Sequence, residues 1–162
     1  MSASATATGP SLGAGTYLTF HLGDEEYGID ILRVREIIGM LPITRVPGAP
    51  SEMIGVINLR GKVIPVVSLR ARFHLQATEA HPHNVIVVVE GPHSLLGFAV
   101  DRVREVASFV DADLEAPPTY GLDVDASYVR SIAKSQNRVR ILLAIDRLLS
   151  PEAAALVAGL PG

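Results

Sequence analysis

Residues 17–22 alternate between apolar and other side chains, the pattern typical of a β-strand with two different faces. One face of this strand would carry Leu18, Phe20 and Leu22, and the other Tyr17, Thr19 and His21. A turn follows at residues 23–26, and residues 27–31 return as a second strand. Residues 33–38 can extend as another strand, and the proline-rich residues 39–50 read as a loop. The first third of the chain therefore predicts β-structure.

A hairpin is predicted around residues 58–61. The flanking residues 53–57 and 63–67 are apolar on consecutive positions, as in strands that are covered on both faces. The glycine of the connection can adopt the positive φ angle that short hairpin loops need. The tip is unusual, because an apolar and a cationic residue, Leu59 and Arg60, stand where a solvated turn is expected. On the residues alone, an exposed tip without a role is the simpler interpretation.

The chain also repeats itself. Residues 18–38 align without gaps on residues 87–107, so that Gly28 falls on Gly97 and Ile37 on Val106. Within this alignment, residues 33–36 and residues 102–105 are identical at every position. Because the surrounding pattern of strand, turn, glycine and strand also matches, coincidence is a poor explanation. The sequence predicts an internal duplication.

The second half of the repeat is less regular. Residues 63–68 have a counterpart in residues 141–146, which places Ser68 opposite Asp146. Together the two alignments predict a duplicated all-β unit of roughly 65 residues. The proline- and aspartate-rich residues 111–127 are expected to be mostly loop.

The two ends of the chain differ from this pattern. Residues 1–16 are small and polar, and a disordered tail is expected there. Residues 150–162 predict a short C-terminal α-helix: Ser150 suits the N-cap, Pro151 the first helical position, and Gly159 the end. Such a short helix is stable only when it packs on the rest of the protein.

Composition narrows the class of protein. The chain has 162 residues, no cysteine and a formal net charge of −3. Disulfides and thiolate metal sites are thus excluded, and the lack of a basic stripe argues against binding to nucleic acid. No apolar run reaches the roughly 18 residues of a membrane span, and the N-terminus does not read as a signal peptide. We expect a cytoplasmic, β-rich protein without direct membrane insertion.

The sequence carries no recognisable pattern of a catalytic or metal-binding site. His81 and His83 form the one histidine pair that suggests a metal, but no third ligand follows at a recognisable spacing. Asp123 and Asp125 lack the spacing of a calcium loop. No phosphate-binding glycine loop and no nucleophile elbow are present. The sequence predicts no enzyme, no cofactor and no metal; an enzyme or metal protein is the remote alternative.

Three motifs, taken in order, carry a family resemblance. They are GDEEYGIDIL at residues 23–32, VxEI at residues 34–37 and GxxNLRGxxxPV at residues 55–66. With this combination the chain resembles the CheW family of chemotaxis coupling proteins, over about residues 17–149. The resemblance implies an all-β fold of two tandem five-stranded SH3-like β-barrels, with the first barrel at about 17–76 and the second at about 83–149. It leaves room for terminal strands that cross between the barrels. The departures from the family pattern are Ser68, Arg102 and Ser131.

The resemblance also implies partners. CheW-type adaptors join the cytoplasmic tips of methyl-accepting chemoreceptors to the regulatory domain of the histidine kinase CheA, without catalysis of their own. The residues expected to bind the kinase are Val34, Glu36, Ile37, Asn58, Leu59, Arg60 and Gly61. Receptor binding is expected in a groove between the barrels, lined by Val103 and Val106. Glu36 and Arg60 are expected to approach each other, with Arg60 partly buried by Leu59 and Val34.

Each of these residues has a simpler interpretation beside the functional one. Without the resemblance, Val34 and Ile37 are more often core residues, and Glu36 and Arg60 form an ordinary surface ion pair worth about 0–1 kcal/mol. The alternative function is the same adaptor role in a different chemosensory pathway, such as surface motility by pili.

Overall fold

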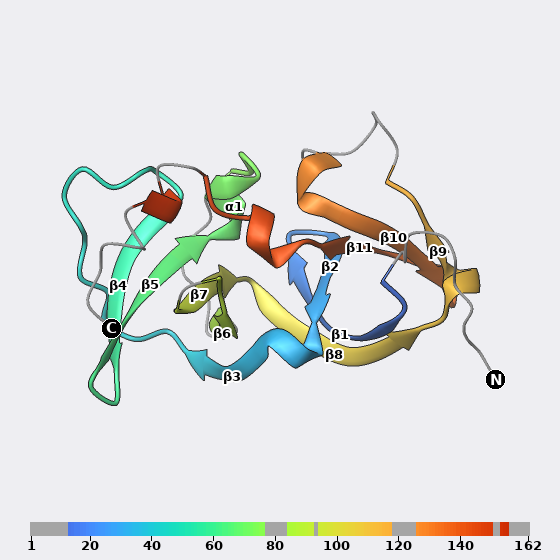
Figure 1. The fold of residues 1–162 in the computed structure, drawn as a ribbon, viewed down its shortest axis with the longest axis horizontal. Coiled ribbons are helices and arrows are strands. Elements are labelled where there is room, and N and C mark those ends of the chain that lie inside the picture. The colour runs from blue at the N-terminus through green and yellow to red at the C-terminus, as the bar shows by residue number, and fades with distance from the viewer. Residues whose placement is uncertain (1–12, 77–83, 93, 118–125, 151–152, 156–162) are drawn as a thin grey trace.

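The computed structural model describes residues 13–76, 84–92, 94–117, 126–150 and 153–155, and these residues form a mainly β-structure (Figure 1). The strands are β1 (Gly15–Leu22), β2 (Glu25–Asp30), β3 (Val34–Gly39), β4 (Met53–Leu59), β5 (Lys62–Ser68), β6 (Val85–Glu90), β7 (Leu95–Val100), β8 (Arg102–Phe109), β9 (Leu114–Glu115), β10 (Val129–Ser135) and β11 (Arg138–Leu143). The helical segments are α1 (Leu69–Arg72) and the 3₁₀ turns η1 (Ile31–Arg33), η2 (Asp111–Asp113), η3 (Ala126–Tyr128) and η4 (Ile145–Arg147).

The strands form two sheets, which correspond to the two SH3-like barrels of the fold. The sheet of the first barrel has the order β3-β6-β7-β5-β4, and that of the second barrel has the order β8-β1-β2-β11-β10-β9. The first barrel has the expected five strands. The second has six in the described residues, because the two-residue β9 pairs with β10.

The barrels do not divide the chain at the expected boundary. Residues 17–76 and 83–149 each contribute to both sheets: β1 and β2 lie in the second barrel, and β6 and β7 in the first. The strands of the two repeats are joined by parallel pairs: β5 of the first repeat pairs with β7 of the second, and β11 of the second pairs with β2 of the first. The chain passes from the second barrel to the first at η1, between β2 and β3. It passes back at Asp101, between β7 and β8. The first barrel is therefore a continuous segment, residues 34–100.

The predicted duplication is confirmed by the register of the edge strands. In β3, Ile37 pairs with Val87, and in β8, Val106 pairs with Leu18. The sequence alignment places Ile37 on Val106 and Leu18 on Val87, so the two pairs are equivalent. Both strands also carry an irregularity at the same point, at Arg35 in β3 and at its counterpart in β8. The identity of residues 33–36 with residues 102–105 thus marks two equivalent edge strands.

The second part of the repeat needs a correction. The parallel pairs join Val66 to Gly97 and Leu142 to Gly28. Since the two glycines are equivalent in the repeat, Val66 is equivalent to Leu142, and the equivalent of Ser68 is Ala144 and not Asp146. Ser68 and Ala144 both precede a helical turn. The segment between β8 and β10 is longer than that between β3 and β4, so the offset between the two repeats changes here and the sequence alone does not fix the register.

Ser68 has a local role at this point of the first barrel. Its hydroxyl accepts a hydrogen bond from the backbone N–H of Ala71 at 3.2 Å and so caps α1. Serine is one of the residues preferred at such a position. The departure from the family pattern at Ser68 therefore keeps a side chain that can start the helix.

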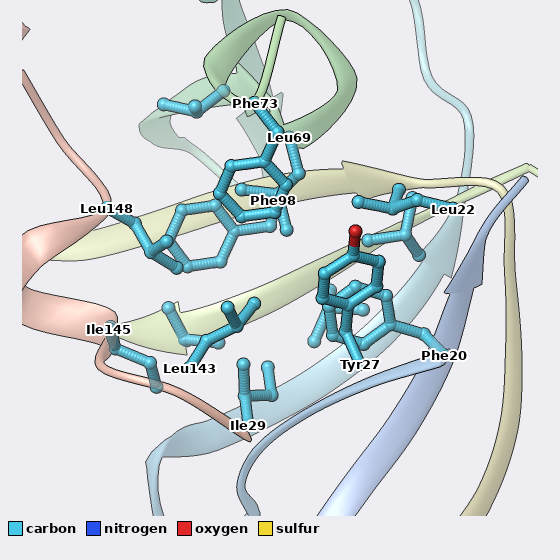
Figure 2. Packing of buried hydrophobic residues seen from close by; sticks show 14 of the residues in the cluster. Phe20, Leu22, Tyr27, Ile29, Leu69, Phe73, Phe98, Leu143, Ile145 and Leu148 are labelled. Carbon is cyan, nitrogen blue, oxygen red and sulfur yellow. The ribbon is translucent and has the colours of Figure 1, made fainter. Parts of the chain in front are cut away.

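The largest hydrophobic cluster lies between the two barrels (Figure 2). Tyr27 of the second barrel stacks on Phe73, which follows α1, with ring centroids 5.5 Å apart, and Phe73 stacks in turn on Tyr128 at 5.8 Å. Each barrel also has a small interior cluster. In the first barrel it contains Ile57, Ile64, Val66, Ile86 and Val88; in the second it contains Tyr17, Phe109, Leu114, Ala133 and Leu142. Strand β5 is therefore covered on both faces, as the consecutive apolar residues 63–67 predicted.

The ends of the chain are described in part. Gly15 and Thr16 belong to β1, so the N-terminal segment that was expected to be disordered is shorter than predicted; residues 1–12 lie outside the described part. At the other end, residues 153–155 are helical, and the Ser150 hydroxyl accepts a hydrogen bond from the backbone N–H of Ala153 at 3.1 Å. Ser150 thus caps this helix as predicted, and the remainder of the predicted helix lies outside the described residues.

Candidate partner-binding surface

The β4–β5 hairpin turns on Arg60 and Gly61, which both have left-handed backbone angles, with φ of 50° and 86°. Leu59 pairs with Lys62 across the turn, so the connection has two residues and the geometry of a type I′ turn. The Asn58 side chain accepts a hydrogen bond from the backbone N–H of Gly61 at 2.9 Å. Asn58 and Gly61 therefore shape the tip, and the positive φ expected of Gly61 is present.

The Arg60 guanidinium donates to the Glu36 carboxylate, so the expected approach of these two residues is confirmed. The expected burial of Arg60 is wrong, because its side chain is 71% exposed. The apolar neighbours do not cover it: Leu59 packs against the interior of the first barrel, and Val34 packs against the cluster between the barrels. The pair lies at the surface and joins the edge strand β3 to the hairpin tip.

The two apolar residues of β3 have different surroundings. Val34 packs against the cluster between the barrels, whereas Ile37 is 44% exposed. In the second barrel, the equivalent residues Val103 and Val106 repeat this arrangement: Val103 packs against the same cluster, and Val106 is 57% exposed. Of these four residues, Ile37 and Val106 thus offer substantial apolar surface to a partner, and they lie on the edge strands of different barrels.

Leu32 is an exposed apolar residue that the sequence did not single out. It lies in η1, at one crossing between the barrels, and is 83% exposed. The Asp30 carboxylate accepts a hydrogen bond from the Leu32 backbone N–H at 2.9 Å and caps the turn. In the sequence, an aspartate before a short apolar run can indicate such a turn. The apolar pattern of residues 27–31 favours a strand instead, so the turn was not predicted.

The space between the barrels is filled by side chains over most of its extent, with a surface pocket at the crossing. This pocket is lined by Asp30, Arg33, Arg130, Ile145 and Asp146, among others. The Arg33 guanidinium donates to the Asp146 carboxylate at 2.7 Å, which ties η1 to η4 across the pocket. A partner at the junction would therefore meet a shallow charged surface beside the exposed Leu32.

A buried charge cluster in the second barrel was also missed. Arg140 is 1% exposed, and its guanidinium lies 3.4 Å from both Glu26 and Glu105. Arg138 donates to the same two carboxylates at 2.7 Å. Burial raises the pKa of Glu26, but hydrogen bonds and charge from Arg138 and Arg140 outweigh this and hold it below its ordinary value. Polar residues in a strand ordinarily face solvent, and nothing local in the sequence marks these as paired.

His21 borders this cluster. Both of its ring nitrogens are buried without a hydrogen-bond partner among the described residues. Burial lowers the pKa of His21, and the nearby Arg102 lowers it further, so the neutral ring is favoured. His21 therefore adds no positive charge to the cluster when its ring is neutral.

The described residues hold no group of three or more histidine, cysteine, aspartate or glutamate side chains arranged to bind a metal ion. The histidine pair His81 and His83 and the acidic pair Asp123 and Asp125 lie outside the described part of the chain. No helix in the part of the chain that the structure describes is long and apolar enough to cross a membrane.

The chain is similar to known proteins over most of its length. The family model described as a CheW-like domain matches residues 16–153. The chain is 36% identical over 141 residues to Chemotaxis protein CheW of Klebsiella aerogenes, covering 87% of this chain and 85% of that protein. It is 34% identical over 140 residues to Chemotaxis protein CheW of Rhizobium meliloti (86% and 90%), and 27% identical over 135 residues to Protein FrzA of Myxococcus xanthus (82% and 84%).

The fold has a solved counterpart as well. The crystal structure of the scaffolding protein TtCheW from Thermoanaerobacter tengcongensis superposes with a TM-score of 0.79, at 30% sequence identity, over 93% of this chain and 96% of that one. On its sequence and on its fold, the chain belongs to the CheW family of chemotaxis scaffold proteins.

Proposed function

We propose that this protein is a non-catalytic chemotaxis adaptor, which couples methyl-accepting chemoreceptors to the regulatory domain of the histidine kinase CheA. It acts in the cytoplasm, at receptor arrays that it reaches through its partners. One observation supports the proposal beyond family membership. On the first barrel, Glu36 of β3 pairs with Arg60 of the hairpin tip, and the exposed Ile37 lies next to Glu36 in β3. Apolar surface with charges at its rim is typical of a protein-binding site.

The kinase face lies on the first barrel. It consists of Val34, Glu36 and Ile37 of β3 and residues 58–61 at the hairpin tip. The residues divide by role: Ile37 and Arg60 offer contact surface, Glu36 orients Arg60, and Asn58 with Gly61 holds the turn. Val34 and Leu59 are half-buried and anchor the two elements to the protein core.

The receptor face lies at the junction of the barrels. Chemoreceptor tips are helical, and a helix needs apolar anchors on the surface that receives it. Val106 of β8 is exposed and serves as one anchor, while Val103 supports it from the core side. Leu32 in η1 adds a second exposed anchor at the crossing between the barrels.

Charged substitutions test the two faces. Glu36→Lys is expected to weaken binding to the kinase regulatory domain at least tenfold and to leave receptor binding unchanged. Val106→Asp is expected to do the reverse; this position is preferred to Val103, which packs on the core. Binding of each folded variant to both purified partners is measured by calorimetry. Equal impairment of the same partner by both variants would show that the two-face assignment is wrong.

A second candidate is the same adaptor role in a different chemosensory pathway, such as surface motility by pili. The similarity to Protein FrzA, a relative with a name other than CheW, favours keeping it. Purification of the protein with its bound partners from its native cells, followed by mass spectrometry, identifies which kinase and receptors it serves.

A further inference from the structure

The chain crosses between the barrels twice, and the internal repeat makes the two crossings equivalent. The alignment of the repeats places Leu32 of η1 on Asp101, which is the single residue between β7 and β8. The two residues have opposite surroundings, because Leu32 is 83% exposed whereas Asp101 is half-buried. The same point of the framework is therefore open at one crossing and covered at the other.

Asp101 is bonded to both barrels. Its carboxylate accepts hydrogen bonds from the Arg70 guanidinium of α1, in the first barrel, at 2.8 Å and from the backbone N–H of Gly23, in the β1–β2 turn of the second barrel, at 2.7 Å. Arg70 also donates to the second carboxylate oxygen, so the ion pair is bidentate. The backbone N–H of Asp101 donates to the carbonyl oxygen of His21 at 3.1 Å, and its carbonyl oxygen accepts from the Asn84 side chain at 2.9 Å. We call Gly23, Arg70 and Asp101 the crossing node.

The node holds its carboxylate in the charged form. Burial raises the pKa of Asp101, but hydrogen bonds from Arg70 and Gly23 outweigh this and hold it below its ordinary value. The side chains of Arg70 and Asp101 are only 18% and 24% exposed, so water and salt screen this pair less than a surface pair. Loss of either side chain would leave a partly buried charge without its partner.

At the η1 crossing every member of the node is replaced. Besides Leu32 in place of Asp101, the alignment places Pro92 on Gly23. The register of the parallel strand pairs makes Asp146 the equivalent of Arg70. Proline has no backbone N–H to donate, and an aspartate has the charge opposite to that of arginine. A carboxylate at the position of Leu32 would therefore meet a like charge, and an apolar side chain is the better fit.

A more exposed ion pair holds the η1 crossing instead. Arg33, the neighbour of Leu32, donates to the Asp146 carboxylate at 2.7 Å and to the backbone oxygen of Glu90, in the first barrel, at 2.8 Å. The side chains of Arg33 and Asp146 are 30% and 60% exposed, so their attraction is weakened by solvent. The two barrels are thus held firmly at Asp101 and weakly at η1.

We propose that Arg70 and Asp101 are positioning residues for the receptor face: they fix the angle between the barrels, and this angle sets where Leu32 stands relative to Val106. The inference rests on the proposed function, in which Leu32 and Val106 anchor the receptor. Val106 belongs to β8, which begins directly after Asp101, and Leu32 is tied to the first barrel through its neighbour Arg33. A change of the angle therefore moves one anchor relative to the other. The kinase face lies within the first barrel and does not depend on the angle.

Distances between spin labels test whether the node fixes the angle. The chain has no cysteine, so Ser51→Cys before β4 and Ala112→Cys in η2 place one exposed label on each barrel. In double electron–electron resonance, Asp101→Ala is expected to broaden the distribution of label distances. The matched control, Asp146→Ala, breaks the ion pair of the equivalent crossing and is expected to leave the distribution unchanged. No broadening in Asp101→Ala, or equal broadening in both variants, would contradict the assignment of the node.

Binding to the two partners separates positioning from general damage. Asp101→Ala, with its fold checked by circular dichroism, is expected to bind the purified receptor tip at least fivefold more weakly and the kinase regulatory domain as the parent protein does. Asp101→Asn can still accept the hydrogen bond from Gly23 and loses only the charge. We expect a smaller loss of receptor binding from this variant, which serves as the test if Asp101→Ala does not fold.

The possible failures can be told apart. Unchanged receptor binding in the folded variants, or an equal loss of binding to both partners, would overturn the positioning role while the adaptor role stands. If the parent protein does not bind the receptor tip at all, the proposed function fails and the positioning role fails with it.

Discussion

At the scale of single residues, the Glu36–Arg60 pair matters for binding and little for folding. Ion pairs with an exposed partner contribute about 0–1 kcal/mol, because water screens the charges and the long side chains lose freedom. Arg60 is mostly exposed, so Arg60→Ala is expected to change the free energy of unfolding by less than about 1 kcal/mol. The same variant is expected to weaken kinase binding severalfold. Urea unfolding and calorimetric binding measure the two effects.

The control for this prediction is an exposed pair on the other barrel. Lys134 and Glu115 lie 2.7 Å apart, and both side chains are exposed. Lys134→Ala is expected to leave stability and kinase binding unchanged. A large loss of stability in Arg60→Ala would contradict the prediction and would indicate a structural role for the pair.

The buried charge cluster should behave in the opposite way. Arg140→Ala leaves the buried Glu26 carboxylate with fewer partners, and breaking a buried ion pair costs about 3–5 kcal/mol. Since Arg138 still reaches Glu26, we expect a loss near the lower end of that range. The first barrel supplies an apolar replacement: the double variant Glu26→Leu with Arg140→Ile copies Leu95 and Ile64. We expect it to recover most of the stability in urea unfolding. A double variant less stable than Arg140→Ala would contradict this account.

Stability should also fall with acidity. His21 has a lowered pKa in the folded protein, so as the pH drops below about 6.5 the unfolded chain takes up a proton that the folded protein resists. Glu26 has a lowered pKa too, and its contribution is lost as the pH falls below about 4.3. Both effects lower the free energy of unfolding in acid. His21→Gln is expected to flatten the pH dependence between pH 7 and 5.5 in urea unfolding; an unchanged slope would remove His21 from this role.

At the scale of elements, the hairpin tip depends on backbone conformation. Gly61 has a φ of 86° and open space around its α-carbon, so a methyl group there causes backbone strain without a steric clash. Gly61→Ala is expected to cost about 1–2 kcal/mol and to misplace Arg60. Gly39 also has open space but no positive φ, so Gly39→Ala serves as the control and is expected to be neutral. Thermal melts compare the two; equal stabilities would contradict the strain argument.

At the scale of the whole molecule, the exchange of strands should keep two fragments together. A protease site introduced between residues 76 and 84 allows the chain to be cut between its two repeats. Because β5 pairs with β7 and β11 with β2, each fragment supplies strands to both sheets. The cut protein is expected to elute as one species under native conditions and as two fragments on a denaturing gel. Separation under native conditions would contradict the exchanged topology.

The sequence predicted the repeat and the hairpin because both leave local marks, such as the shared glycines Gly28 and Gly97 and the turn glycine Gly61. It did not predict which strands form which barrel, since the sequence of a strand does not show which distant strand it pairs with in parallel. Of the candidate surface, the approach of Glu36 to Arg60 was predicted, whereas the exposure of Leu32 was not. The buried cluster around Arg140 was missed because hydrophobic patterning cannot distinguish a paired buried charge from a solvated one.

The exchanged strands have one further consequence, for ancestry. Each repeat contributes its first two strands to the barrel completed by the other repeat. This is the topology of a domain-swapped homodimer whose two copies have been joined in one chain. In a symmetric dimer of identical chains the two barrels are identical by necessity, whereas two repeats joined in one chain can diverge. The buried Arg140 of the second barrel and the apolar Ile64 at the equivalent position of the first barrel are a difference that two identical chains cannot hold.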